Sequence, residues 1–210
     1  VVLLSHGHYD HLHFASLKRL KGNPLHLVPE GTAGLFKRKG LHRVQELAWW
    51  DSHTVAGVTF TFVPAQHWTR RTLWDMNRSH WGGWVAEGDG RKVYFAGDSG
   101  YFSGFGEIGS RFPDIDTALM PIGAYEPEWF MRNQHVNPEQ AVQAYLDLGS
   151  PRAIFVPMHY GSFRLADDTP REALDRLLAE WQRRGLPEDR LKLPGHGETL
   201  WDPVCLGQEK

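Results

Sequence analysis

Short apolar runs alternate along the chain with stretches of helical periodicity, and glycine or proline marks most of the boundaries between them. Runs of this kind, bounded by turn residues, predict strands. They cover residues 1–4, 25–29, 44–50, 58–65, 117–122, 153–157 and 190–194. Residues 83–87 and 92–96 flank Gly88-Asp89-Gly90, which predicts two further strands joined as a β-hairpin.

Helical periodicity predicts four helices: residues 11–20, residues 30–39, a helix beginning at Asn137, and residues 169–184. The third has the clearest start signal. Asn137 is a good N-cap, Pro138 suits the first helical position, and Gln140 can complete a capping box. Strands and helices mixed in this way predict one layered α/β domain over residues 1–210, with helices covering sheets.

Composition narrows the class of protein without naming a function. Hydrophobic residues make up 41% and charged residues 23% of the chain, as in ordinary soluble domains. The net charge of −2 gives no reason to expect a nucleic-acid partner. The single cysteine, Cys205, excludes an intramolecular disulfide and a multi-cysteine zinc cluster. Without a signal-peptide pattern or a long apolar span, we expect a cytoplasmic protein.

Histidine, present twelve times, changes this picture, because four histidines and an aspartate fall within residues 5–13, SHGHYDHLH. Four predicted strands also run directly into candidate metal ligands: His6, His67, Asp98 and His159. Strand ends in a layered domain can meet at a common edge, where α/β folds place their sites. We therefore expect these side chains to converge.

The donor types indicate the metal. Neutral imidazole and carboxylate suit zinc, manganese or iron, and the near absence of cysteine argues against a thiolate site. The opening turn supplies His6, His8, Asp10 and His11. These ligands can contribute to two metal clusters if the first pair points toward one cluster and the second pair toward the other. Asp98 has two carboxylate oxygens and can bridge a pair of cations.

The motifs also resemble those of a known family. HGHYDH matches the H-x-H-x-D-H signature of the metallo-β-lactamase superfamily. Longer stretches, among them YFAGDSGYF, MHYGSF and GHGE, resemble the N-acylphosphatidylethanolamine-hydrolysing phospholipase D family and its bacterial relatives. The resemblance implies the four-layer αββα fold and two metal ions, most commonly Zn²⁺, with Mn²⁺ or Fe²⁺ as alternatives. It assigns metal one to His6, His8 and His67, metal two to Asp10, His11 and His159, and the bridge to Asp98.

Two features depart from the family pattern. His13 stands where the family has an acidic residue, and we expect it to lie outside the ligand set. The superfamily normally has several strands before its metal motif, whereas this chain begins on the strand that carries it. We therefore expect either an N-terminal segment outside this chain or a reduced first sheet.

The resemblance places further residues around the metals. His135 lies beside the pocket, where it can contact a phosphoryl group or protonate a leaving group; a helix-start or surface role is the alternative. Gln66, Trp68, Tyr125 and Tyr160 are candidate substrate-binding residues of the pocket wall. His196, in a glycine-flanked turn, suggests a structural role.

Tryptophans and arginines raise the question of a lipid. Trp68, Trp74, Trp81, Trp84 and Trp129 lie near predicted ligands, where they can line a groove for acyl chains or pack in the core. Arg70, Arg71 and Arg78 can attract a phosphate or lie in a solvated loop. Peripheral contact with a membrane is therefore compatible with the sequence.

The chemistry of such a site is hydrolysis. Two cations lower the pKa of a bridging water and offset charge in the transition state. The catalytic candidates are Asp10, Asp98 and His135, with a carboxylate taking the proton and His135 acting as acid. The leading hypothesis is a phospholipase D-like hydrolase of an N-acyl ethanolamine phospholipid or related phosphodiester. The alternatives are a lactonase of a sugar phosphate and a metal- or nucleic-acid-binding module without turnover; the oligomeric state stays open.

Overall fold

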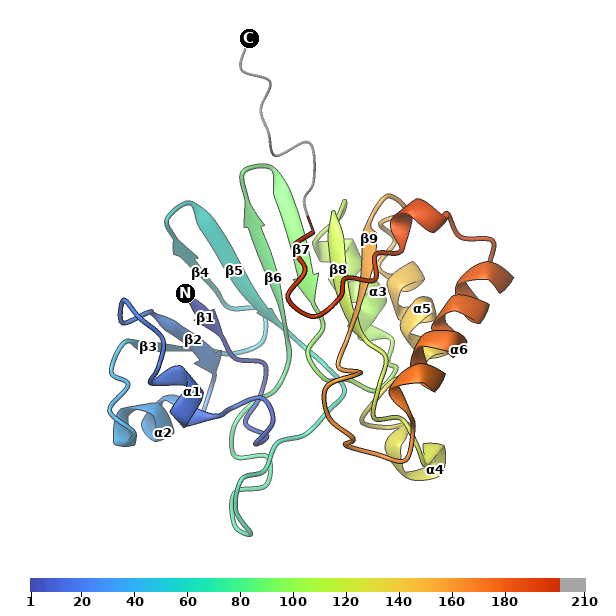
Figure 1. Cartoon of the computed structure of the whole chain (residues 1–210). Helices are drawn as coiled ribbons and strands as arrows, with labels where there is room; N and C mark the ends of the chain where they lie inside the picture. The colour runs from blue at the N-terminus through green and yellow to red at the C-terminus, as the bar shows by residue number, and fades with distance from the viewer. Residues whose placement is uncertain (201–210) are drawn as a thin grey trace.

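The computed structural model describes residues 1–200, so Cys205 lies outside the described residues. Two β-sheets face each other in the middle of the molecule (Figure 1). The first sheet has three parallel strands in the order β1-β2-β3: β1 (Val2–Leu3), β2 (His26–Pro29) and β3 (Val44–Leu47). Because β1 and β2 are parallel, a crossover connection is needed between them, and α1 lies within it.

The second sheet has six strands in sequential order. They are β4 (Ser52–Val55), β5 (Val58–Val63), β6 (Gly83–Gly88), β7 (Arg91–Phe95), β8 (Thr117–Pro121) and β9 (Ile154–Met158). The pairs from β4 to β7 are antiparallel, and β7, β8 and β9 are parallel. The predicted hairpin is confirmed, with Asp89 and Gly90 at positive φ in its turn.

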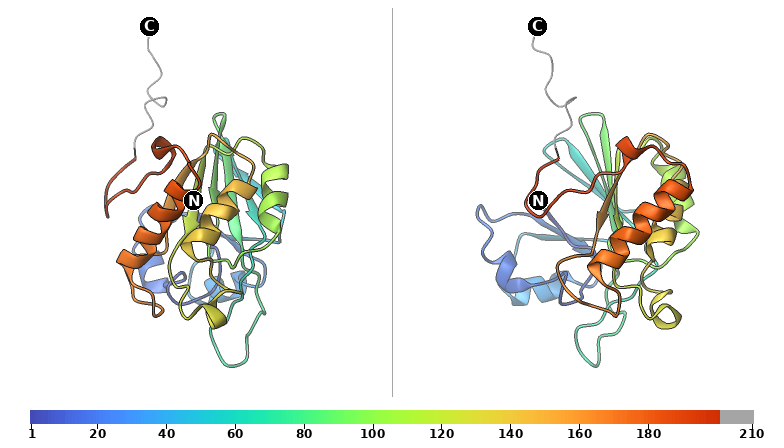
Figure 2. Two further views of the ribbon diagram at one scale, coloured as in Figure 1. Left: turned by 90° about the vertical axis from the view of Figure 1, so that its right-hand side faces the viewer. Right: turned by 45° about the vertical axis from the view of Figure 1, so that its right-hand side comes forward.

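Helices cover the outer faces of both sheets (Figure 1 and Figure 2). The first sheet is covered by α1 (Phe14–Leu17) and α2 (Ala33–Arg38), and the second by α3 (Gly104–Arg111), α5 (Pro138–Asp147) and α6 (Pro170–Arg183). A short helix, α4 (Glu128–Met131), and a 3-10 turn (Glu188–Arg190) complete the described elements. The expected αββα fold is confirmed. Within residues 1–200, no helix combines the length and hydropathy needed to span a membrane.

Three apolar clusters hold the four layers together. Leu27, Leu47, Phe62 and Trp84 pack between the two sheets. A small cluster that includes Leu12, Val28 and Phe36 joins the first sheet to its helices. The largest cluster joins the second sheet to α3, α5 and α6, and it contains Tyr94, Phe105, Ile108, Phe155 and Trp181. Each fully buried side chain of this size contributes about 1.5–3 kcal/mol, so these clusters fix where the strand ends lie.

The two best helix-start predictions are confirmed in atomic detail. The Asn137 side chain accepts a hydrogen bond from the Gln140 N–H at 2.8 Å, and the Gln140 side chain accepts one from the Asn137 N–H at 3.2 Å. At α6, Thr169 accepts from the Glu172 N–H at 3.2 Å. These caps satisfy backbone donors that a helix leaves unpaired at its start.

Other boundary predictions were wrong, for identifiable reasons. The helix predicted over 11–20 is reduced to Phe14–Leu17, because the preceding residues form the turn that carries candidate ligands. The strand predicted over 44–50 ends at Leu47, and the chain turns back to form β4, whose exposed edge has only a weak pattern. The last predicted strand, 190–194, makes only an isolated bridge between Leu191 and Phe155. The helices α3 and α4 were not predicted.

Candidate metal centre

Candidate ligands that follow four different strands lie close together in space. His6 follows β1 of the first sheet. His67, Asp98 and His159 follow β5, β7 and β9 of the second sheet. The structure thus brings together side chains that are far apart in the sequence, as the strand-end pattern predicts.

The turn after β1 separates its own ligands into two groups. The His8 carbonyl accepts hydrogen bonds from the His11 N–H at 3.2 Å and the Leu12 N–H at 2.8 Å, which form one tight turn. Leu12 is buried in the cluster beneath the first sheet's helices and anchors the end of this turn. His6 and His8 therefore precede the bend, and Asp10 and His11 lie on it. We call residues 6–11 the ligand turn.

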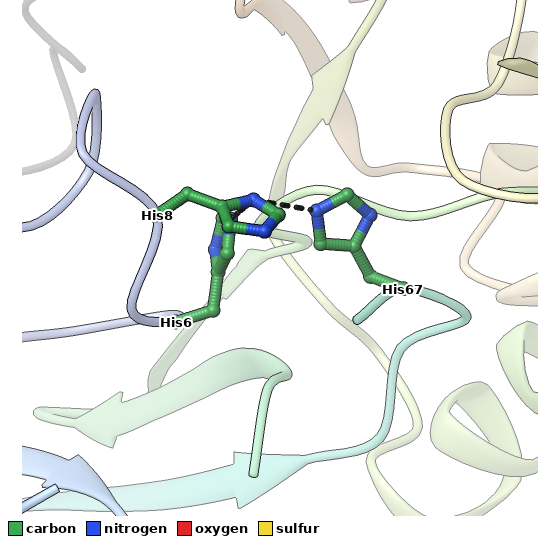
Figure 3. A group of neighbouring side chains, drawn as sticks. All are labelled: His6, His8 and His67. Carbon is green, nitrogen blue, oxygen red and sulfur yellow. Dashed lines mark hydrogen bonds between the residues drawn. The ribbon is translucent and has the colours of Figure 1, made fainter. Parts of the chain in front are cut away.

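The first cluster consists of three imidazoles (Figure 3). His6 Nε2 lies 2.9 Å from His8 Nδ1, and His67 Nε2 lies 3.2 Å from the same atom. The outer nitrogens of His6 and His67 are held in place. The Gln134 carbonyl accepts from His67 Nδ1 at 2.9 Å, and Ser5 Oγ lies 3.1 Å from His6 Nδ1. Such contacts fix the tautomer and orientation of imidazole ligands.

The second cluster combines two imidazoles with a carboxylate. His11 Nε2 lies 3.3 Å, and His159 Nε2 3.7 Å, from Asp10 Oδ2. The two rings stack with centroids 5.3 Å apart. His159 has a φ of 59°, in the left-handed region, and Gly123 packs against its carbonyl so closely that a Cβ would clash there. Its placement is thus determined by the backbone.

Asp98 lies between the two clusters. Its Oδ2 is 3.0 Å from His11 Nε2 in the second cluster, and 3.8 and 3.9 Å from the Nε2 atoms of His6 and His67 in the first. Its Oδ1 is 3.3 Å from His159 Nε2. The residue is only 4% exposed. This is the placement expected of a bridging carboxylate.

Burial and charge set the protonation of these groups. Burial lowers the pKa of His6 well below its ordinary value and that of His67 to about 3, so both rings are neutral near pH 7. Burial would raise the pKa of Asp98, but His159 and His11 hold it well below its usual range. Burial also opposes the charge on His11, yet the Asp10 and Asp98 carboxylates beside its Nε2 raise its pKa to about 10.

The arrangement of these donor atoms suits metal binding better than hydrogen bonding among the side chains. His11 Nε2, His159 Nε2 and Asp98 Oδ1 are buried without a hydrogen-bond partner, which is costly unless something else satisfies them. One group of mutually close donors comes from His6, His8 and His67, and another from Asp10, His11, Asp98 and His159. Imidazole and carboxylate donors in two such groups suit two divalent ions of the zinc, manganese or iron type.

His135 lies on the wall of the site. Its ring stacks on His159 with centroids 5.6 Å apart and meets the His67 ring edge-on at 5.1 Å. Its Nδ1 is buried without a partner, and burial lowers its pKa to about 4. A cavity of about 280 Å³ opens here, lined by His8, Tyr9, Asp10, Asp98, Ala124, Met131, His135, His159 and Leu165. The donors of His135 also lie near those of His67 and Asp98.

Of the other residues predicted to form the pocket wall, one contacts a candidate ligand and three make contacts elsewhere. The Trp68 ring lies 4.6 Å from the His8 ring, and its N–H donates to Gln134 Oε1 at 2.5 Å. Gln66 instead turns its amide to the Asn133 carbonyl at 3.2 Å. Tyr125 is buried in the core, with its hydroxyl donating to Glu172 at 3.1 Å, and is not among the residues that line the cavity. Tyr160 is half-buried and packs against the main core cluster.

The remaining tryptophans and histidines also have defined places. Trp84 is a core residue, and the Trp81 N–H donates to the Ala65 carbonyl at 3.0 Å. Trp74 and Trp129 are 79% and 78% exposed. His13 is exposed at the start of α1, with its Nδ1 2.8 Å from Ser16 Oγ, and His196 lies 3.1 Å from Ser162 Oγ.

Sequence reasoning missed several residues of this site. Gln134 supports both His67 and Trp68, and Ala124, Met131 and Leu165 line the cavity. No sequence motif marks these residues as part of the site, because their positions depend on how α4 and the segment after β9 pack. Tyr9 also lines the cavity, and its role could have been predicted because it stands between two candidate ligands in the sequence.

The four layers, with ligand-bearing strand ends at one edge, define the class of metallo-β-lactamase-fold proteins. Residues 1–160 match the family described as the beta-lactamase superfamily domain, and the chain belongs to this family. The fold resembles that of Igni18, a metallo hydrolase from Ignicoccus hospitalis (TM-score 0.71, 24% identity, 95% of this chain and 77% of that one). It also resembles an isothiocyanate hydrolase from Delia radicum gut bacteria (TM-score 0.74, 21% identity, 96% and 76%).

Sequence relatives have higher identity. An uncharacterized protein of Mycobacterium tuberculosis is 39% identical over 85% of this chain and 48% of its own length. The N-acyl-phosphatidylethanolamine-hydrolyzing phospholipase D 1 of Caenorhabditis elegans is 36% identical over 84% of this chain and 54% of its own. The mitochondrial enzyme of the same description in Saccharomyces cerevisiae is 35% identical over 95% and 44%. The chain thus spans about half the length of these relatives.

Proposed function

We propose that this protein is a metal-dependent hydrolase that cleaves a phosphodiester bond in an N-acyl ethanolamine phospholipid or a closely related compound. The observation that carries the hydrolytic part is Asp98, a buried carboxylate between two clusters of nitrogen and oxygen donors. The relatives from C. elegans and yeast, whose names specify this substrate, support the choice of lipid.

The residues present would hold two divalent ions, most commonly Zn²⁺. His6, His8 and His67 would hold one, Asp10, His11 and His159 the other, with Asp98 between them. When bound, such ions supply Lewis-acid chemistry: they lower the pKa of water and offset charge that develops on phosphoryl oxygens. The outer contacts of His6 and His67 keep both rings oriented toward this pair.

His135 and the carboxylates handle substrate and protons. Because burial keeps His135 neutral near pH 7, its ring offers an N–H to a phosphoryl oxygen or to the leaving oxygen across the cavity. Asp10 is the more exposed of the two carboxylates and lines the same cavity, so it is placed to accept a proton there. The Trp68 ring packs edge-on against the His8 ring and helps to hold that candidate ligand in place.

Exposed apolar side chains in the segments that carry or adjoin the candidate ligands support a lipid substrate and peripheral contact with a membrane. Among residues 1–200, the large hydrophobic side chains that are more than half exposed are Tyr9, Leu73, Trp74, Met76, Trp129, Phe130 and Phe163. Each lies in the ligand turn or in a segment that follows His67, precedes His135 or follows His159. We call these seven residues the apolar rim. Apolar surface concentrated at one end is typical of interfacial binding.

A direct assay tests the proposal. The protein loaded with Zn²⁺ should contain about two metal ions per chain by elemental analysis and should release N-acyl ethanolamine from an N-acyl phosphatidylethanolamine. Phosphatidylcholine and a sugar-phosphate lactone serve as comparison substrates. Hydrolysis of the lactone alone would overturn the lipid assignment, and a protein that binds no divalent metal would overturn the site itself.

A further inference from the structure

One arginine from a distant segment contacts the backbone of the ligand turn. Arg71 lies in the segment between β5 and β6, which runs below the sheets in Figure 1. Its Nη1 donates to the Gly7 carbonyl at 2.6 Å and to the Leu12 carbonyl at 3.1 Å. A third carbonyl, that of His8, lies 3.5 Å away. These carbonyls bracket the residues from His8 to His11, three of which are candidate ligands.

The contact between the two segments has further components. The Arg71 guanidinium lies 4.1 Å from the centre of the Tyr9 ring, and the Tyr9 hydroxyl donates to the Arg71 carbonyl at 2.9 Å. Thr69 Oγ1 accepts a hydrogen bond from the Gly7 N–H at 3.2 Å. A Cβ at Gly7 would come within 2.8 Å of that oxygen, so the Thr69 side chain approaches the Gly7 backbone as closely as glycine allows.

The segment that carries Arg71 is itself held by side-chain contacts. Asp75 Oδ1 accepts from the Arg71 N–H at 2.9 Å and from the Thr72 N–H at 2.7 Å. Asn77 Oδ1 accepts from the Thr69 N–H at 3.1 Å, and the Asn77 N–H donates back to the Thr69 carbonyl at 2.8 Å. The Asp75 carboxylate thus binds backbone rather than the guanidinium, which is left free to point at the ligand turn.

We propose that Arg71 is a positioning residue of the metal centre, which fixes the ligand turn so that His8, Asp10 and His11 face their clusters. The ligand turn lies outside the helices and strands, so fixing it costs backbone entropy that these contacts help to offset. A guanidinium suits the task because the two N–H groups of Nη1 can bind two carbonyls while the planar face covers the Tyr9 ring. The inference rests on the proposed metal centre and not on the proposed substrate.

Metal affinity is the measurement that shows whether Arg71 positions the metal ligands or only stabilises the fold. We would compare Arg71→Gln, Arg71→Lys and the matched control Arg70→Gln in Zn²⁺ competition with a chromophoric chelator. The absorption spectrum of the Co²⁺-loaded protein would report ligand geometry. Arg70 is adjacent, but its guanidinium donates only within its own loop, to the Thr72 carbonyl at 2.9 Å. Changes in residues that support metal ligands typically cost about 10- to 100-fold in affinity.

We expect Arg71→Gln to weaken the binding of at least one metal by about tenfold or more and to alter the Co²⁺ spectrum. Arg71→Lys should be intermediate, and Arg70→Gln should match the wild type. Asp75→Ala leaves Arg71 in place but removes the acceptor that holds its loop. This variant keeps the test informative if Arg71→Gln does not fold, and it should weaken metal affinity in the same direction. Arg71 variants that melt earlier but bind both metals with unchanged affinity and spectrum would overturn the proposal. A wild type that binds no metal would instead overturn the metal centre.

Discussion

At the scale of single residues, charge matters more than shape for Asp98. The side chain is buried, and its two oxygens lie near imidazole nitrogens of both clusters. An amide of the same size would keep the packing but remove the negative charge that holds cations together. Leaving a buried charge without its oppositely charged partner costs several kcal/mol.

We therefore expect Asp98→Asn to lower the affinity for at least one metal and to reduce turnover by orders of magnitude. Elemental analysis and a hydrolysis assay on the same preparation measure both effects. His13→Asp is the matched control, because His13 is exposed, is not among the grouped metal donors, and hydrogen-bonds to Ser16. If the two variants behaved alike, Asp98 would have no place between the metals.

The neutral histidines predict how the metal-free protein responds to acid. The pKa values of His135 and His67 fall from 6.5 to about 4 and about 3, because burial penalises the charged ring. As the pH falls from about 6.5 toward 4, the unfolded chain therefore binds protons that the folded protein does not. The free energy of unfolding should decrease over this range.

His135→Gln should make that decrease shallower, because it removes one of the buried histidines responsible. Urea unfolding of the metal-free variant and wild type at a series of pH values from 7 to 4.5 measures the slope. His42→Gln is the control, since His42 is exposed. An equal slope in His135→Gln and wild type would mean that His135 is not neutral in the folded protein.

At the scale of elements, the strand ends decide where the second cluster lies. Gly123, just after β8, packs against the carbonyl of His159, just after β9, and no side chain fits between them. Gly97 has a φ of 66°, and this conformation lets the chain turn sharply after β7 and present Asp98. Both glycines therefore act on ligand placement through the backbone.

We expect Gly123→Ala to displace His159, weaken the binding of one metal and destabilise the fold by about 1–3 kcal/mol through overpacking. Metal stoichiometry and the denaturation midpoint measure these effects. The matched control is Gly106→Ala in α3, where a Cβ would meet only the Asp147 carbonyl at 3.8 Å and where alanine favours the helix. Equal metal binding by the two variants would show that the contact with His159 is unimportant.

At the level of single elements, the features that could be predicted from the sequence are those determined by residues close together in the chain. The start of α5 was predictable because Asn137, Pro138 and Gln140 act on their own backbone. The convergence of His6, His67, Asp98 and His159 was predictable because each follows an apolar strand. By contrast, the region after His11 has helical periodicity but is shortened by the ligand turn, and Tyr125 faces α6 through a contact with Glu172. Cavity walls such as Met131 and Leu165 depend on long-range packing, which no local pattern records.

At the scale of the whole molecule, the apolar rim gathers at the end where the candidate ligands lie. Its members come from four segments that the fold brings around the ligand strand ends. Trp74 and Trp129 are the largest of them and carry the most exposed apolar area. If this end meets a lipid surface, these two side chains should contribute most to the binding energy.

We expect Trp74→Ala and Trp129→Ala each to weaken binding to phosphatidylcholine–phosphatidylglycerol vesicles by about 10- to 150-fold, since burial of such a side chain is worth about 1.5–3 kcal/mol. Cosedimentation measures the effect, and metal content should not change. Leu178→Ala, on the outer helix α6, is the control for general loss of apolar surface. Unchanged vesicle binding in both tryptophan variants would contradict a role of the apolar rim in membrane contact.

The candidate ligands come from both sheets, and this has a consequence for the mechanics of the fold. A pair of ions held by the ligand turn and by His67, Asp98 and His159 would cross-link the three-stranded sheet to the six-stranded one. The cross-link would join segments about 150 residues apart, and tying such distant points together restricts the unfolded chain strongly. Removal of metal should then loosen the small first sheet before the large second one. Hydrogen exchange after chelation should show the amides of β2 and β3 exposed first, while those of β8 and β9 stay protected.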